Sequence, residues 1–155
     1  MRVLLILAHP NTDSFTHALA ARAQSALVAA GHSVDLLDLY ALGVSAAMSA
    51  DEHRAYHTDS PLIDPLITAH TELVKAAQAM VFVYPTWWSA QPAILKGWLE
   101  RVMVPGVGFT FNAKGKVRPG LTHVRRIVGV STYGSPRSCV SLVNDNGRRT
   151  LLRTL

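Results

Sequence analysis

The chain has 155 residues, of which 49% are hydrophobic and 16% charged, so it is long enough for one domain with a sizeable core, and its composition excludes a disordered chain. Its net charge of +5 is unevenly spread, because residues 1–95 hold four Lys or Arg against eight Asp or Glu, and residues 96–155 hold eleven against two. The basic residues of the second half are dispersed, which argues against a nucleic-acid partner and favours a solvated face or a landing zone for a phosphorylated small molecule.

The first half of the sequence alternates an apolar run with helical periodicity. Residues 2–8 (RVLLILA) are continuously apolar, which is typical of a strand buried on both faces of a parallel sheet. Apolar side chains then recur with helical spacing over residues 15–30, and Gly31 stands where a C-terminal cap is expected. Residues 33–39 (SVDLLDL) predict a second strand, and residues 61–77 carry a weaker helical pattern.

The second half continues the same alternation. Residues 76–85 contain a third predicted strand, and residues 91–102 (QPAILKGWLERV) predict a helix with one apolar face. Residues 125–132 (RRIVGVST) predict a fourth strand, and residues 140–155 predict the start of another helix. Strands that alternate with helices indicate an α/β fold with a doubly wound parallel sheet and right-handed crossovers.

The end of the predicted fold is incomplete. A doubly wound sheet of this kind normally closes with a fifth strand and a final helix, but the apolar pattern still continues at Leu155. We therefore expect residues 1–155 to form a single domain that is truncated at its C-terminus. The alternatives are a last strand supplied by something else and a domain that is stable with four strands.

The polar segment between the first strand and the first helix predicts an anion site. Ligands of open α/β sheets bind beyond the carboxyl ends of the strands, and a helix capped by Asp13 or Ser14 presents free backbone N–H groups there. Hydroxyl and amide side chains and His9 can add donors to a phosphate. The segment has no glycine, which disfavours a dinucleotide-binding Rossmann fingerprint. In the alternative interpretation, Asp13 and Ser14 only cap the helix.

A second loop, YPTWWSAQP, follows the third strand to the same edge of the sheet. The adjacent Trp87 and Trp88 would form an exposed apolar patch unless a flat ring covers them, which favours a cofactor. Alternatively, the two tryptophans plug the top of the core or fill a dimer contact. The third loop, STYGSPRS, adds hydroxyl groups after the fourth strand. Together the three loops favour a flavin site.

Other chemistries lack their motifs. No GxxxxGK is present, which excludes a P-loop, and Tyr133 replaces the second glycine of a nucleophile elbow. His53 and His57 have no third metal ligand nearby, so we predict surface histidines and no metal site. Cys139 is predicted to be a packed thiol. As the only cysteine it cannot form an intrachain disulfide, which favours a cytoplasmic protein. The first apolar run is too short for a signal peptide or a membrane span.

The segments LLILAHPNTDSFTHAL and VYPTWWSAQPAILKGWLERVMVPGVGFTF resemble the flavodoxin-fold NAD(P)H:quinone oxidoreductases. This DT-diaphorase-like group includes bacterial modulators of drug activity and potassium-efflux ancillary reductases. The resemblance extends from the first to the fourth strand and implies a flavodoxin-like sheet of order 2-1-3-4-5, here without its fifth strand. It also implies FAD, or alternatively FMN, at the carboxyl edge, and a homodimer with active sites at the interface.

The resemblance assigns cofactor-binding roles to all three loops. The first loop would hold phosphates, the second would hold the edge of the isoalloxazine ring, and the third would complete the site. The residues in these roles are His9, Ser14, Phe15 and Thr16 in the first loop, Pro85, Thr86, Trp87 and Trp88 in the second, and Ser131, Thr132, Tyr133 and Gly134 in the third.

The third loop departs from the pattern of the mammalian-type enzymes. Those enzymes carry two glycines after the Thr pair, then a Tyr and a His that assist hydride transfer to the quinone. Here Tyr133 stands at the first glycine position, and Cys139 and Asp145 fall near the positions of the Tyr and the His. No catalytic residue is therefore predicted.

We predict a flavin-dependent NAD(P)H oxidoreductase. It would transfer a hydride from a nicotinamide through flavin N5 to a small-molecule, quinone-like acceptor, because the flavin supplies the difficult chemistry and the protein supplies orientation. The main alternative is a flavin-binding regulatory or ancillary subunit with little turnover. A hydrolase is the third possibility.

Overall fold

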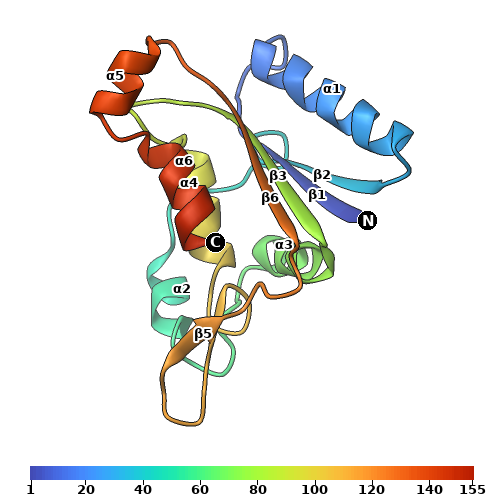
Figure 1. Ribbon diagram of the computed structural model, residues 1–155. Helices are drawn as coiled ribbons and strands as arrows, with labels where there is room; N and C mark the ends of the chain where they lie inside the picture. The colour runs from blue at the N-terminus through green and yellow to red at the C-terminus, as the bar shows by residue number, and fades with distance from the viewer.

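The computed structural model describes residues 1–155, apart from the side chain of Thr154. The protein folds as a four-stranded parallel sheet with helices on both faces (Figure 1). Its strands are β1 (Arg2–Leu7), β2 (Ser33–Asp38), β3 (Ala79–Pro85) and β6 (Arg126–Thr132), in the order β2-β1-β3-β6. The predicted α/β class is confirmed, and the four parallel strands occupy the first four places of the expected order.

The two central strands, β1 and β3, are buried on both faces. Alternate side chains of these strands, such as Leu4 and Phe82, enter a core closed by α3 (Pro65–Ala76), α4 (Ala93–Val102) and α6 (Asn146–Thr154). The intervening side chains, such as Leu5 and Val81, enter a second core covered by α1 (Phe15–Ala29). This double burial is why both strands are continuously apolar in sequence.

Helix α1 begins and ends at the predicted caps. Ser14 is the N-cap, and its Oγ accepts a hydrogen bond from the backbone N–H of His17 at 3.2 Å. At the other end Gly31 has a φ of 77°, and the N–H groups of Gly31 and His32 donate to the carbonyls of Val28 and Leu27. This is the Schellman arrangement, which favours glycine at this position.

Helix α4 is held by burial of its apolar face and by an ionic cluster. The predicted apolar positions are all buried, namely Ile94, Leu95, Trp98, Leu99 and Val102. On the same helix the buried Arg101 donates to Glu52 at 2.7 Å and to Asp64, which caps α3. Glu52 belongs to a short helix, α2 (Ala50–Ala55). Arg101 therefore ties α2 and the start of α3 to α4.

Three elements differ from the sequence prediction. Helix α2 and the hairpin of β4 (Phe109–Phe111) and β5 (Val117–Pro119) were not predicted, because six and three residues are too few to show a period. The single helix predicted over residues 140–155 is wrong. The chain forms α5 (Arg137–Leu142) and α6, which are separated where Asn144 and Asp145 adopt φ values of 67° and 43°. Asn and Asp tolerate this left-handed conformation better than most residues, which permits the break.

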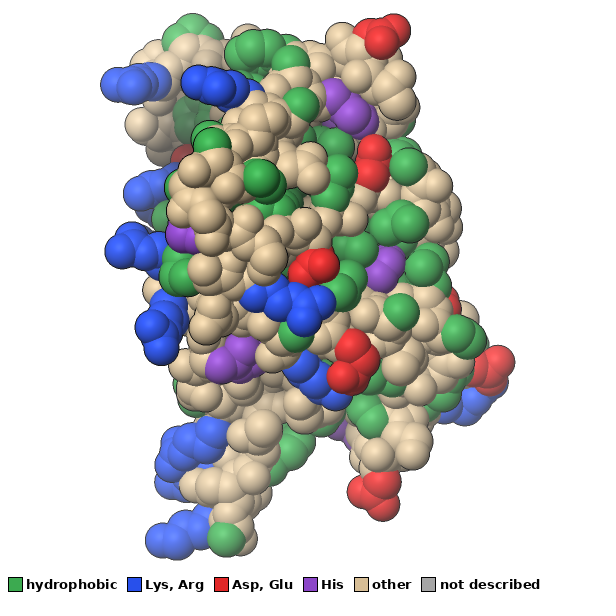
Figure 2. Space-filling model, turned by 90° about the vertical axis from the view of Figure 1, so that its right-hand side faces the viewer, with side chains coloured by type: hydrophobic (Ala, Val, Ile, Leu, Met, Phe, Trp, Pro, Cys, Tyr) green, Lys and Arg blue, Asp and Glu red, His purple; other side chains and the backbone are tan. Residues whose placement is uncertain are grey.

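The basic side chains are unevenly placed on the molecule. Figure 2 shows Lys and Arg side chains along one edge and at the lower end, where the β4–β5 hairpin projects. The hairpin carries the exposed Lys114, Lys116 and Arg118. The opposite end of the sheet, where the parallel strands terminate, lies near α5 and the start of α1 (Figure 1).

Candidate functional site

The three loops selected from the sequence meet at the carboxyl edge of the sheet. The register aligns Leu7 with Val83, and Pro85 with Thr132, so β1, β3 and β6 terminate together. The first and second loops are joined by His9 and Trp87, whose ring centroids are 5.8 Å apart. The parallel arrangement therefore brings residues 9, 87 and 132 to one edge, which is where open α/β sheets bind ligands.

The first loop presents donors at the N-terminus of α1. The N–H groups of Phe15 and Thr16, the first two residues of the helix, have no intrahelical partner by helical geometry. The Nδ1 atom of His9 lies 3.1 Å from both the backbone nitrogen and the carbonyl oxygen of Asn11, so the backbone of Asn11 holds the ring at this nitrogen. The side chain of Phe15 is exposed, whereas Thr16 is buried. The loop therefore offers backbone N–H groups and an imidazole to an anion.

The second loop contains a tight turn with a strained backbone. The backbones of Trp87 and Ala90 exchange two hydrogen bonds of 3.1 Å, and the two residues between them, Trp88 and Ser89, have φ values of 48° and 60°. Such turns favour Asn and Gly because both central residues are left-handed. The indole of Trp88 is fully exposed, so nothing within this chain covers it. Bulky residues in strained conformations are concentrated at functional sites.

The third loop is joined to the second by hydroxyl groups. The Oγ1 of Thr86 and the Oγ of Ser131 are 2.8 Å apart, and the Tyr133 hydroxyl donates to Oδ1 of Asp145 at 3.0 Å. Burial and this bond to Asp145 raise the pKa of Tyr133. Burial raises the pKa of the neighbouring Tyr84 to about 12, with Tyr133 and Asp145 adding to the effect. Both phenols are therefore neutral donors near pH 7.

A cavity of about 370 Å³ lies between the second and third loops. Its volume falls in the range of small-molecule sites. Two strained segments border it, since Trp88 and Asp145 both line it at positive φ. The other lining residues are Thr86, Ser89, Tyr133, Gly134, Ser135, Cys139, Val140 and Val143.

The predicted site residues differ in whether they line this cavity. Thr86, Trp88, Tyr133 and Gly134 line the cavity, whereas Trp87 and the first-loop residues His9, Ser14, Phe15 and Thr16 are not among its lining residues. Ser131 is not a lining residue but is bonded to Thr86, and the carbonyl of Thr132 accepts a backbone bond from the N–H of Thr86 at 2.8 Å. Pro85 is buried in β3, so it places the loop.

The sequence prediction was wrong for Cys139 and missed the pair of His17 and Asp38. Cys139 is exposed and lines the cavity, so it is not a packed thiol, because α5 buries none of its residues. The missed pair is His17 and Asp38, which are 3.2 Å apart beside the first loop. The available signal was that His17 lies three residues after the helix cap and Asp38 ends a neighbouring strand.

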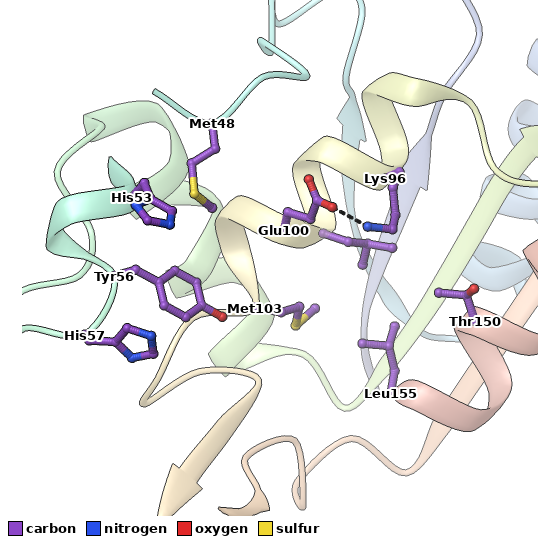
Figure 3. A pocket seen from close by; sticks show the side chains of 10 residues that line it. Met48, His53, Tyr56, His57, Lys96, Glu100, Met103, Thr150 and Leu155 are labelled. Atoms are coloured by element: carbon purple, nitrogen blue, oxygen red, sulfur yellow. Dashed lines mark hydrogen bonds and ion pairs between the residues drawn. The ribbon is translucent and has the colours of Figure 1, made fainter. Parts of the chain in front are cut away.

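A second cavity lies away from the predicted residues. It has a volume of about 520 Å³ and is bordered by α2, α4 and α6 (Figure 3). Met48, Tyr56 and Met103 give it an apolar lining, and the ion pair of Lys96 with Glu100 lies at one side. The predicted surface residues His53 and His57 are exposed and line this cavity. None of the predicted cofactor-binding residues borders it.

The described residues contain no cluster of three or more His, Cys, Asp or Glu side chains that could hold a metal ion. Within the same part of the chain, no helix combines the length and the apolar character needed to cross a bilayer.

Comparison with known proteins identifies the fold and relatives. Residues 1–153 match the family model described as flavodoxin-like fold. The chain is 32% identical over 149 residues to NAD(P)H dehydrogenase [quinone] 1 of Rattus norvegicus, an alignment that covers 86% of this chain and 54% of the rat protein. It is 31% identical over 166 residues to the protein of the same name from Cavia porcellus, with 97% of this chain and 60% of the relative covered. The chain therefore spans little more than half the length of these relatives.

A solved structure agrees with these matches. The NAD(P)H:quinone oxidoreductase from Methanothermobacter marburgensis superposes with a TM-score of 0.81 at 26% identity. The superposition covers 98% of this chain and 74% of the archaeal one.

Proposed function

Because this chain belongs to the flavodoxin-like fold family, we propose that it is a flavin-dependent NAD(P)H oxidoreductase acting on a quinone-like acceptor. The observation that carries the proposal is the fully exposed Trp88 in a strained turn beside the 370 Å³ cavity. A flat apolar ring would cover this indole and offset the cost of its exposure. The names of the two mammalian relatives and of the archaeal structure support the same reaction class.

The donor set fits a flavin. The ring region has the hydroxyl groups of Thr86 and Tyr133 and the indole of Trp88, with the Ser131 hydroxyl bonded to Thr86 and the Tyr133 proton engaged by Asp145. When bound, the flavin supplies hydride and electron transfer, which protein side chains cannot perform. In the proposal, Thr86 and Tyr133 orient the polar edge of the ring, Trp87 and Trp88 exclude water from its face, and Gly134 leaves room beside it.

The phosphate region fits an anion. We assign the phosphate to the N–H groups of Phe15 and Thr16, the hydroxyl of Ser14 and the imidazole of His9. Thr16 contributes through its backbone because its side chain is buried. FAD is the first candidate and FMN the second, with NADH or NADPH as the electron donor.

Two properties of the whole protein belong to the same proposal. We propose a homodimer, since the exposed Trp88 is also suited to a contact between subunits. Light scattering at several protein concentrations tests this state. We propose a cytoplasmic location, because the exposed free thiol of Cys139 is compatible with a reducing compartment.

A flavin-binding ancillary subunit is the second candidate. The observation that favours it is that Cys139 and Asp145 stand near the positions where the resembling enzymes use Tyr and His, and Asp145 is already bound to Tyr133. Steady-state oxidation of NADH and NADPH with a quinone acceptor separates the two. Turnover supports the enzyme, and flavin binding without turnover supports the ancillary subunit.

The proposal is tested by the absorbance and fluorescence of the purified protein. We expect a flavin spectrum, and we expect stripping the flavin to restore the fluorescence of Trp87 and Trp88. Trp98 is the internal control, because it is fully buried within α4 and donates to His70 at 3.2 Å, and its fluorescence should change less. Failure to retain or rebind FAD or FMN would contradict the proposal.

A further inference from the structure

Ser14, His17 and Asp38 form a continuous chain of contacts at the start of α1. The Nδ1 atom of His17 lies 3.1 Å from the hydroxyl oxygen of Ser14. Its Nε2 atom lies 3.2 Å from Oδ2 of Asp38, at the end of β2. Both members of the His17–Asp38 pair are mostly buried, with side-chain exposures of 17% and 19%. The other oxygen of Asp38 accepts from the N–H groups of Tyr40 and Ala41, which fix the carboxylate.

The carboxylate selects the tautomer of neutral His17. A bare Nε2 facing Oδ2 of Asp38 would set two acceptors against each other, so Nε2 carries the proton. Nδ1 is then an acceptor, and the contact with Ser14 is favourable only when the Ser14 hydroxyl donates to it. Ser14 has one proton to donate. In this state that proton is directed at His17 and is withheld from a phosphate.

Protonation of His17 reverses the bond to Ser14. Both ring nitrogens then donate, Nε2 to Asp38 and Nδ1 to Ser14. The Ser14 oxygen accepts from the His17 ring and from the His17 backbone, and its own proton becomes free. We infer that proton uptake by His17 releases the Ser14 hydroxyl to donate to the flavin phosphate, so that His17 is a positioning residue acting through Ser14. The inference rests on the proposed function for the identity of the anion.

The surroundings of His17 favour this coupling. From the end of β2 it faces Asp38, and from the first loop it faces His9, whose ring centroid is 6.1 Å away. A phosphate bound at the N-terminus of α1 attracts a positive charge on the ring of His17, and that charge in turn attracts the phosphate. The anion and the proton therefore stabilise each other's binding, which is a reciprocal linkage.

The first test uses the protein without flavin and needs no variant. Nitrogen-15 NMR of the histidine ring reports which nitrogen of neutral His17 carries the proton. We expect the proton on Nε2 at pH 8. A proton on Nδ1 would overturn the inference, because the Ser14 hydroxyl would then be free at all pH values.

The second test measures the dissociation constant of FAD between pH 6 and pH 8. FAD contains no phosphate monoester, so its own charge does not change in this range. We expect roughly tenfold weaker binding at pH 8, the loss expected for one hydrogen bond to a charged acceptor. The dependence should become clearly smaller in S14A and in H17F, which retain His9 beside the phosphate, and it should persist unchanged in H32Q, which alters a half-buried histidine beyond the far end of α1.

The outcomes separate this inference from the proposed function. Equal pH dependence in wild type and S14A, or pH-independent binding of FAD by wild type, would overturn the coupling alone. Absence of FAD and FMN binding at every pH would overturn the proposed function and the coupling with it. Riboflavin, which lacks the phosphate, should bind with no pH dependence that involves Ser14.

Discussion

Trp88 is the residue at which the local backbone conflicts most with the side chain. A left-handed non-glycine residue costs about 1–3 kcal/mol, and here the side chain is a bulky, fully exposed indole. Ser89, next in the chain, shares the left-handed conformation but carries a small side chain. The pair therefore separates the role of the turn from the role of the indole.

We predict that removing the backbone strain at Trp88 and at Ser89 has the same effect on stability but different effects on flavin binding. W88G and S89G should each raise the free energy of unfolding by about 0.5–1 kcal/mol, because glycine adopts positive φ without steric cost. Only W88G should weaken flavin binding, by roughly three- to tenfold for a lost aromatic contact. Denaturant unfolding and flavin titration measure the two effects. Unchanged flavin affinity in W88G would place the indole outside the cofactor site.

Among the glycines, the backbone of a neighbouring segment comes closest at Gly97, where α4 meets the segment before α2. A Cβ atom on Gly97 would lie 1.9 Å from the carbonyl oxygen of Ala46, and this neighbour is backbone. Gly129 in β6 is a matched contrast, because its Cβ would lie 3.8 Å from a side-chain carbon of Leu151. Glycine is therefore required at residue 97, because the backbone of Ala46 lies where any other side chain on α4 would begin.

We predict that G97A destabilises the protein by about 3 kcal/mol or more, at the upper end for overpacking, since backbone cannot rotate away. G129A should change the unfolding free energy by less than about 1 kcal/mol, because its contact is an ordinary one. Thermal unfolding of the two variants provides the comparison. A stability for G97A equal to that of G129A would show that the two segments can separate without cost.

The ionic cluster that joins α2, α3 and α4 makes stability depend on pH. Burial would raise the pKa of Glu52, but hydrogen bonds from Ser49 and Arg101 lower it below its ordinary value of 4.5. Burial would also raise the pKa of Asp64. Hydrogen bonds from the N–H of Leu66 and from Arg101 outweigh this effect and lower that pKa below its ordinary value of 3.8. Groups with depressed folded pKa values stabilise the fold above their ordinary pKa values, and that stability is lost as pH falls through the folded values.

We therefore predict that unfolding free energy declines as the pH falls below about 4.5, and that R101M makes this decline shallower. At pH 7, R101M should cost about 3–5 kcal/mol, since it leaves the buried carboxylate of Glu52 without its cation and also removes the partner of the half-buried Asp64. K96M is the control on the same helix, because Lys96 forms an exposed pair with Glu100 and should cost less than about 1 kcal/mol. A wild-type acid slope retained in R101M would exclude the cluster as its source.

At the scale of the whole molecule, folding divides the basic half of the chain between two ends. Lys114 and Lys116 lie between β4 and β5, in the hairpin that projects at the lower end of the molecule in Figure 1, away from α5 and the start of α1. Arg148 instead lies beside Tyr133, where both border a small cavity next to β6. Only the second location is suited to guide a nicotinamide nucleotide to the site.

We predict that the Michaelis constant for NADPH rises more steeply with ionic strength than that for NADH, because the additional phosphate adds charge that salt screens. R148E should remove the difference, and the double variant K114E/K116E should retain it. Steady-state kinetics at several salt concentrations measures both. The same salt dependence for the two nucleotides would identify the basic half as a solvated face.

The sequence by itself determined the α/β class, the four long strands, helices α1 and α4 and the loops that carry the candidate site. These features depend on local periodicity and on caps such as Ser14 and Gly31, and each is complete within about 15 residues. Because the carboxyl ends of parallel strands meet at one edge of the sheet, the sequence also predicted that the loops lie together. Short elements such as β4 were not predicted, because a segment of three residues is too short to show a hydrophobic period.

Only the tertiary structure decided which side chains meet. His17 and Asp38 are 21 residues apart, Arg101 and Glu52 are 49 apart, and Thr86 and Ser131 are 45 apart. It also decided that Cys139 is exposed and that Trp88 has no cover within the chain. The physical reason is that burial and long-range hydrogen bonds are set by the register of the sheet and by the packing of helices on it, and no local sequence pattern encodes either distance.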